Sequence, residues 1–284
     1  MRRIAILTFS MFAALPAFSQ TAPAPAPPAT PGAAAAPGAA ATPGPHPKSP
    51  EENNALVALL NSVGDEDKAT STAARATAAD VVIKNATDLL AKYPDTDYKA
   101  VVQMHLAQAY HYKNDDPKAI SIGEQSLEAD PNSYETLLLM SEIYSRSTRS
   151  TDLDKDDRLA KADKYAKQAL PLIAKAVKPN PNISDADWAQ AQGAENQRAY
   201  LSMGYASIVA GKPSDADASF DKAFSVFSPD PVELIRIGRA YGQGAKNYDE
   251  AIKWDDKAAA LPGVADQIKT YATSDKTRWQ GMKK

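Results

Sequence analysis

The sequence predicts an all-helical protein in which antiparallel helix pairs are stacked in series, and three observations support this fold class. Residues 106–110 (LAQAY) recur 34 residues later as residues 140–144 (MSEIY). A pair of small residues seven positions apart also recurs along the chain, and both members lie on one helix face because seven residues are nearly two turns. No stretch alternates polar and apolar residues long enough to predict a sheet.

Residues 1–19 are predicted to be a cleavable signal peptide. Arg2 and Arg3 precede an apolar stretch, and the small residues Ala17 and Ser19 stand three and one positions before the expected cut. An uncleaved membrane anchor is the alternative, but the apolar stretch is shorter than the roughly 20 residues that span a bilayer. No later segment reaches that length. We therefore expect a periplasmic or secreted protein with no membrane span after cleavage.

Residues 20–50 are predicted to be a Pro/Ala-rich, disordered linker. This segment holds ten of the 21 prolines. Proline lacks an amide donor and moves its predecessor out of the α region, so helices and sheets cannot propagate here. Few large apolar side chains are present to offset the entropy of ordering. The linker is either a spacer that holds the folded part away from a surface or a passive tail left after cleavage.

Residues 51–284 are predicted to form the helical repeat domain. Residues 52–97 form a degenerate leading pair of helices, in which Ala79 and Ala86 stand seven apart. Residues 264–284 form a closing helix, which a terminal repeat needs because its outer face has no neighbour. The later pairs of small residues are Ala119 and Ser126, Ala162 and Ala169, Ala216 and Ala223, and Ala251 and Ala258, with Tyr165, Phe220 and Trp254 between the members of the last three.

These spacings resemble the tetratricopeptide repeat (TPR) family, over residues 100–133, 134–177, 197–230 and 231–262. The closest match is the set Gly204, Gly211, Ala216, Phe220 and Ala223. Gly123 departs from the pattern where an aromatic ring is expected, and Ser141 where a smaller residue is usual. The resemblance implies an α-solenoid, a superhelix whose first helices line a concave, peptide-binding groove.

Helix ends and insertions follow from local sequence. Asp115 and Pro213 stand at predicted helix starts, where free amides favour acids and proline is tolerated, and Gly211 fits a C-terminal cap. Relative to the other repeats, nine extra residues separate Tyr144 from Ala162, and 20 extra residues separate Ala169 from Tyr200. We expect these insertions to lengthen the flanking helices and splay the stack.

The resemblance also assigns candidate groove residues, one row per first helix. They are Met104, Gln108, Leu138, Glu142, Arg198, Leu201, Tyr205, Ile235, Arg236 and Arg239. Family members that bind a chaperone's C-terminal carboxylate use Lys and Asn at these positions, and neither is present here. An apolar row beside three arginines favours an amphipathic segment with some acidity.

Composition excludes several classes of function. The chain has no Cys, and three of its 32 basic residues lie within the first fifty, so residues 51–284 carry a formal charge of −6, which does not favour nucleic acid. The Asp152–Asp156 stretch resembles the start of a calcium loop but lacks the turn glycine, so we expect it to solvate a loop. His105 and His111 lie on different faces of one predicted helix. We expect no metal and no cofactor.

The sequence therefore predicts a non-catalytic protein–protein interaction scaffold in the cell envelope that binds a peptide or helix in its groove. No phosphate-binding loop or Gly-x-Ser-x-Gly elbow suggests an enzyme. The alternative is an envelope carbohydrate-binding protein or hydrolase, with the inserted segments 145–157 and 174–196 forming a pocket and Trp188 stacking on a sugar. The identity of the partner and the oligomeric state stay open.

Overall fold

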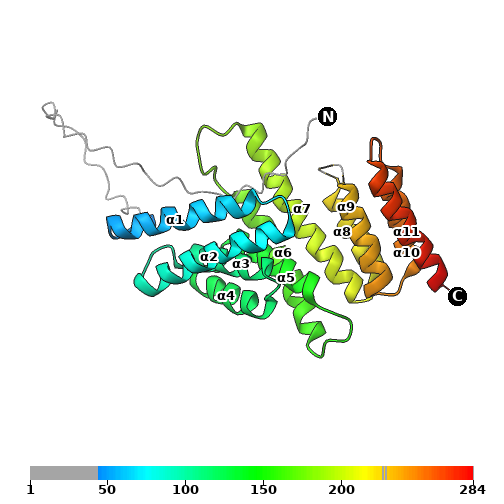
Figure 1. Cartoon of the computed structure of the whole chain (residues 1–284), viewed down its shortest axis with the longest axis horizontal. Coiled ribbons are helices and arrows are strands. Elements are labelled where there is room, and N and C mark those ends of the chain that lie inside the picture. Colours follow the sequence, from blue (N-terminus) through cyan, green and yellow to red (C-terminus); the bar gives the residue numbers. More distant parts are fainter. Residues whose placement is uncertain (1–43, 226, 228, 284) are drawn as a thin grey trace, which may run out of the picture.

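The computed structural model describes residues 44–225, 227 and 229–283, and within them the regular secondary structure is helical throughout. The predicted signal peptide and most of the predicted linker lie outside the described residues. Consecutive helices run antiparallel and stack along the long axis of the molecule (Figure 1). This arrangement confirms the predicted fold class.

Five helix pairs and a closing helix make up this stack. The pairs are α1 (Pro50–Asp67) with α2 (Thr72–Lys92), α3 (Lys99–Tyr112) with α4 (Asp116–Ala129), α5 (Tyr134–Ser147) with α6 (Lys155–Lys175), α7 (Asp185–Val209) with α8 (Pro213–Ala223), and α9 (Pro231–Arg239) with α10 (Tyr248–Ala260). A π-helical turn, η1 (Ala240–Gly244), extends α9, and α11 (Asp266–Met282) packs on α10 at the C-terminal end.

The recurring small residues lie where the second helix of each pair meets its neighbours. All ten members of the five pairs are fully buried. Phe220 and Trp254 fill the space between them and pack edge-on, with ring centroids 5.3 Å apart. In the α3/α4 pair, where the ring is replaced by Gly123, the side chain of Met140 from α5 occupies the space instead.

Local capping ends the helices where the sequence predicts. The side chain of Asp115 accepts a hydrogen bond from the amide of Lys118 in the first turn of α4. Gly211 takes a left-handed conformation, with φ of 73°, directly after α7. This conformation is the one that favours glycine at a helix C-terminus.

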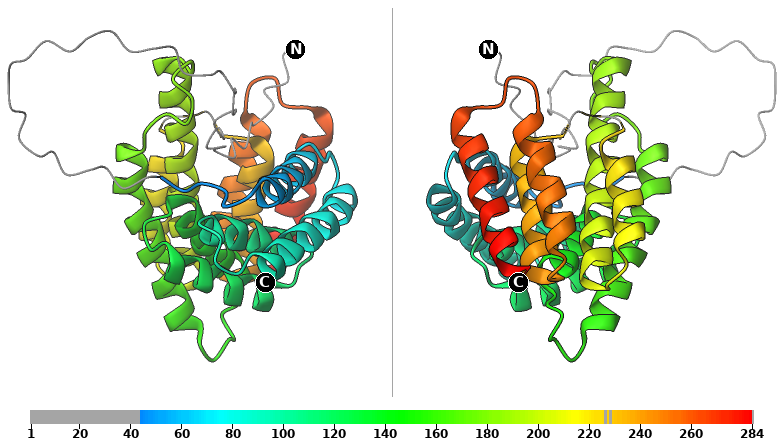
Figure 2. Two further views of the ribbon diagram at one scale, coloured as in Figure 1. Left: turned by 90° about the vertical axis from the view of Figure 1, so that its left-hand side faces the viewer. Right: turned by 90° about the vertical axis from the view of Figure 1, so that its right-hand side faces the viewer.

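The two insertions lengthen helices, as expected. The first adds the loop between α5 and α6 and contributes to α6, which has 21 residues. The second contributes the start of α7, which has 25 residues and extends beyond its neighbours (Figures 1 and 2).

The long helix α7 connects two hydrophobic cores. Ala206 belongs to the core that α3–α6 form, whereas Tyr205 belongs to the core of α8–α11. A third core joins α1 and α2 to α3. At the C-terminal end, the fully buried Trp279 of α11 closes the last core. Within the described part of the chain, no helix has the combination of length and apolar character that crossing a bilayer requires.

Candidate functional site

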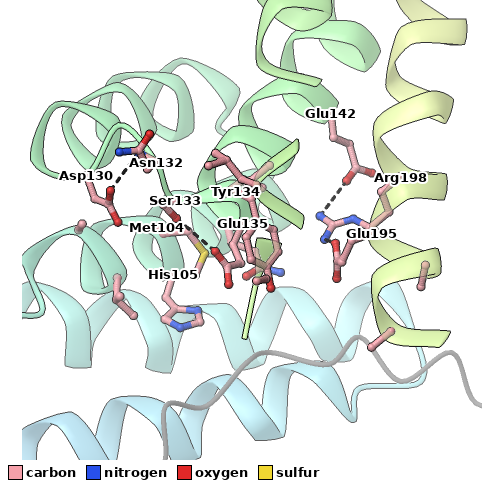
Figure 3. Close-up of a pocket in the computed structure, with 18 of the residues that line it drawn as sticks. Met104, His105, Asp130, Asn132, Ser133, Tyr134, Glu135, Glu142, Glu195 and Arg198 are labelled. Atoms are coloured by element: carbon pink, nitrogen blue, oxygen red, sulfur yellow. Dashed lines mark hydrogen bonds and ion pairs between the residues drawn. The ribbon is translucent and has the colours of Figure 1, made fainter. Parts of the chain in front are cut away.

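The first helices of successive pairs enclose a groove of about 1810 Å³. The walls come from α3, α5 and α7, which the TPR resemblance assigns to the groove, and from α1. Figure 3 shows Met104 and His105 on α3 facing the cavity, with Tyr134 and Glu135 at the start of α5 and Arg198 on α7 across from them.

The wall that α1 contributes is not predicted by the resemblance. Leu56, Leu59 and Leu60 of this helix line the groove. Leu56 and Leu59 are also part of the core that packs on Val102 of α3. The leading pair of helices therefore contributes to the lining of the groove in addition to beginning the stack.

Six of the ten candidate residues line the groove and four do not. The six are Met104, Gln108, Glu142, Arg198, Leu201 and Arg236. Leu138, Tyr205 and Ile235 are only 1%, 6% and 4% exposed, because they pack between helices in the hydrophobic cores. Arg239 forms an ion pair with Asp275 of α11, away from the groove.

The rotation of α5 about its axis and the hydrogen bond of Tyr205 explain why Leu138 and Tyr205 do not line the groove. On α5, Leu138 and Leu139 both belong to the hydrophobic core, and of the two only Leu139 also reaches the lining of the groove. The hydroxyl of Tyr205 donates a hydrogen bond to Glu233 across 2.8 Å, and its ring packs against Phe220. Successive residues of a helix point about 100° apart. The spacing of residues in a degenerate repeat does not determine which of two neighbouring positions points to the groove.

The second insertion supplies a large part of the groove wall. Asp187, Gln190, Ala194 and Arg198 line it at intervals of three and four residues, and so they lie along one face of α7. This spacing is visible in the sequence and identifies the face once the segment is taken as helical. Trp188, the residue that favoured a carbohydrate site, and the first insertion do not line the groove.

Two arginines that line the groove, Arg198 and Arg236, are joined with the neighbouring Arg146 to glutamates in a continuous chain of contacts. Arg198 lies 2.8 Å from Glu195 and 3.5 Å from Glu142. Arg146 lies 3.2 Å from Glu142 and 3.1 Å from Glu233. Arg236 then pairs with the second oxygen of Glu233 at 3.1 Å and completes the network.

This pairing cancels the positive charge that the sequence analysis assigned to the groove. The network contains three arginines and three glutamates. Burial on its own would raise the pKa of Glu142, but Arg146 and Arg198 outweigh it and hold that pKa below its ordinary value. Glu142 is therefore ionised at neutral pH and compensates its two neighbours. Arg236 has the most open of the three guanidinium groups, with 59% of its side chain exposed.

Several of the α3 and α5 side chains that line the groove are uncharged, although Glu135 and Glu142 of α5 line it as well. Burial lowers the pKa of His105 to about 4, so its imidazole is neutral at physiological pH. Met104, Gln108 and Leu139 lie beside it on the same two helices. Burial and the nearby Glu135 raise the pKa of Tyr134, which stays protonated. These uncharged side chains thus offer apolar surface and neutral polar groups.

The second histidine of α3 lies outside the groove. His111 does not line the groove and pairs with Asp116 at 2.7 Å. Across residues 44–225, 227 and 229–283, no three His, Asp or Glu side chains are placed to hold a metal ion. The fold and the groove define an all-α protein of stacked helix pairs that encloses a large groove lined by both apolar and charged side chains.

The sequence matches no known family model and no curated protein. Solved structures that resemble it include a thermophilic TPR protein of Thermus thermophilus, with 17% identity, a TM-score of 0.44, and coverage of 79% of this chain and 98% of that one. A computationally designed self-assembling cyclic homooligomer has 14% identity and a TM-score of 0.22, covering 81% and 91% of the two chains. Both TM-scores are below 0.5, so the fold assignment rests on the pairing of the helices in this chain and not on either similarity.

Proposed function

We propose that this chain is a non-catalytic interaction protein of the TPR type, and that its groove binds a polypeptide segment of a partner. The observation that carries the proposal is the groove itself. Pockets for small molecules are typically about 300–1,000 Å³, and this groove is about 1810 Å³. Its length along several first helices suits an extended strand or a helix better than a compact metabolite.

The chemistry of the lining indicates what kind of segment fits. Partly exposed apolar side chains from three helices, Leu60, Met104 and Leu201, offer a surface for apolar side chains of the partner. The paired arginines and glutamates form a neutral boundary. A segment with apolar anchors and little net charge is therefore favoured over a strongly acidic one.

We further propose that the protein acts in the cell envelope. This location depends on the signal sequence in residues 1–19, which lie outside the described part of the chain. Determining the N-terminal sequence of the protein isolated from its native envelope tests it. A start at Gln20 supports export and cleavage, and a start at Met1 contradicts them.

A matched pair of variants tests the groove. Ala191→Arg places a long charged side chain on the groove face of α7, and Ala218→Arg makes the same change on the exposed face of α8, outside the groove. Tagged protein is used to capture partners from envelope extract. We expect wild type and Ala218→Arg to capture the same species, and Ala191→Arg to lose them. The helix content of all three proteins should be the same. Equal capture by both variants contradicts the groove as the binding surface.

A further inference from the structure

The chain enters the folded domain at the edge of the groove. Pro45 lines the groove, and its carbonyl accepts a hydrogen bond of 3.0 Å from the hydroxyl of Tyr98. The amide of His46 donates to Asp97, and the ammonium of Lys48 lies 3.3 Å from the same carboxylate. These two groups hold the pKa of Asp97 below its ordinary value. Pro45 is therefore held in place at the edge of the groove.

One rim of the groove continues from this entry point. The loops that join successive helix pairs each contribute residues to the lining: Thr96 and Tyr98 before α3, Asn132 and Ser133 before α5, Ile183 before α7, and Phe227 and Asp230 before α9. The loops follow one another along the stack in chain order. A segment that leaves Pro45 along this rim passes the start of each first helix in turn.

The preceding segment has the length to follow this path. Residues 21–43 contain seven prolines, and the rest are Ala, Gly and Thr. In the polyproline II conformation, at about 3.1 Å per residue, the segment reaches about 70 Å. Neighbouring helices pack roughly 8–10 Å apart, so the first helices from α3 to α9 span about 30 Å.

The chemistry of the segment also matches the groove. Residues 21–43 carry no charged side chain, and Arg198 and Arg236 of the groove are already paired with glutamates. Proline-rich strands bind grooves that offer aromatic rings and hydrogen-bond donors to their exposed carbonyls. Here Tyr98, Tyr112 and Tyr134 line the groove, with the side-chain amides of Asn132 and Gln190.

We propose that residues 21–43 bind in the groove of their own chain as a polyproline II strand, and that a partner must displace them. The inference rests on the proposed function in taking the groove as a polypeptide-binding surface. Because the segment is tethered at Pro45, its effective concentration at the groove is on the order of millimolar. Even a weak intrinsic affinity then gives substantial occupancy, and a partner gains access only by competition.

Cysteine crosslinking in the full chain tests this proposal, because the native sequence contains no Cys. Ala39→Cys lies six residues before Pro45, about 19 Å in polyproline II, which is about two helix spacings. It is combined with Gln190→Cys on the groove face of α7 or with Ala218→Cys on α8, outside the groove. We expect the intramolecular disulfide with position 190 to form at least about tenfold faster than with position 218.

Two further measurements complete the test. An excess of a synthetic peptide of residues 21–43 is expected to slow the position 190 reaction, as is replacement of the segment's prolines by serine. Equal rates at positions 190 and 218 overturn the proposal. A disulfide between two chains also overturns it, since the occupant is then the segment of a second copy.

The result is separable from the test of the proposed function. If the crosslink fails while Ala191→Arg still abolishes partner capture, self-occupancy is overturned and the groove remains a partner-binding surface. If the crosslink forms while Ala191→Arg leaves capture unchanged, self-occupancy is supported and the proposed partner site is contradicted.

Discussion

Arg146 on α5 and Glu233 on α9 form an ion pair of 3.1 Å although 87 positions separate them in the chain. The guanidinium of Arg146 also lies over the ring of Tyr205, 4.4 Å from its centroid, and Tyr205 donates its hydroxyl to the same glutamate. Three first helices, α5, α7 and α9, therefore meet at one carboxylate. This contact joins the two larger hydrophobic cores where the groove is lined by Glu233 and Arg236.

Replacing the shared carboxylate is expected to destabilise the protein. Glu233→Ala leaves the Tyr205 hydroxyl without its acceptor and removes one of the two carboxylates that Arg146 contacts. Hydrogen bonds to a charged group are worth about 1.5–3 kcal/mol. We predict a loss of about 2–3 kcal/mol in the free energy of unfolding. Glu128→Ala, at an exposed position of α4, is the matched control and should change it by less than about 0.5 kcal/mol. Urea unfolding measures both changes. If Glu233→Ala and Glu128→Ala lowered the free energy of unfolding equally, Glu233 would not be a stabilising contact between the helices.

Two glycine substitutions should have opposite effects on stability. A methyl group added at Gly204 would overlap the ring of Phe220, which is fully buried between Tyr205 and Trp254. We expect Gly204→Ala to cost about 1–3 kcal/mol through overpacking.

The control for this substitution is Gly64 in α1, where an added methyl group meets no atom within 4 Å. Gly64→Ala should stabilise the protein by about 0.5–1 kcal/mol, because alanine is favoured over glycine in a helix. Thermal unfolding of both variants checks the pair. A neutral Gly204→Ala would mean that α7 and α8 are packed less closely than described.

The stability of the C-terminal end is predicted to fall as pH rises from about 4 to about 7. Asp255 of α10 is only 1% exposed and accepts a hydrogen bond of 2.9 Å from the indole of Trp279. Burial raises the pKa of Asp255 to about 7, and the nearby Asp275 adds to this effect, whereas Arg239 opposes it. In this pH range the folded protein retains a proton that the unfolded chain has released, so each increase in pH favours unfolding.

Asp255→Asn should remove this dependence while keeping an oxygen for the indole. Its stability relative to wild type should increase between pH 4 and pH 7, by an amount on the order of a few kcal/mol. Denaturant unfolding of both proteins at pH 4.5 and pH 8 measures the difference in stability between them. Because both proteins contain the other titratable groups, the effects of those groups cancel in this difference. A constant difference between the two proteins at both pH values would contradict the assignment.

The sequence predicts the fold because its signals are local and repeated. Ala119 and Ser126, like each of the other pairs of small residues, are fully buried at a helix interface. Small side chains seven positions apart fit only a closely packed helical face. Gly211 ends α7 because its φ of 73° is disfavoured for other residues.

The site is less predictable because it depends on helix rotation and on contacts between distant residues. Leu138 and Leu139 are both apolar and both buried, and only the packing of α5 decides that Leu139 reaches the lining of the groove and Leu138 does not. The pairing of Arg198 with Glu142 connects helices 56 positions apart. The pairs Glu142/Arg146, Glu195/Arg198 and Glu233/Arg236 are local, at helical spacing. The contacts Arg146–Glu233 and Arg198–Glu142, which join these pairs into one network, are not local. The network neutralises the arginines, and so the predicted preference for acidity is weakened.

Photo-crosslinking in the native envelope tests the central claim, that the groove is a polypeptide-binding surface. A photoreactive amino acid is placed at position 191 on the groove face of α7 or at position 218 on the exposed face of α8, and the adducts are identified by mass spectrometry. The account predicts adducts with polypeptide, either a partner or residues 21–43, at position 191 and few at position 218. The absence of adducts at position 191, or equal yields at the two positions, would contradict it.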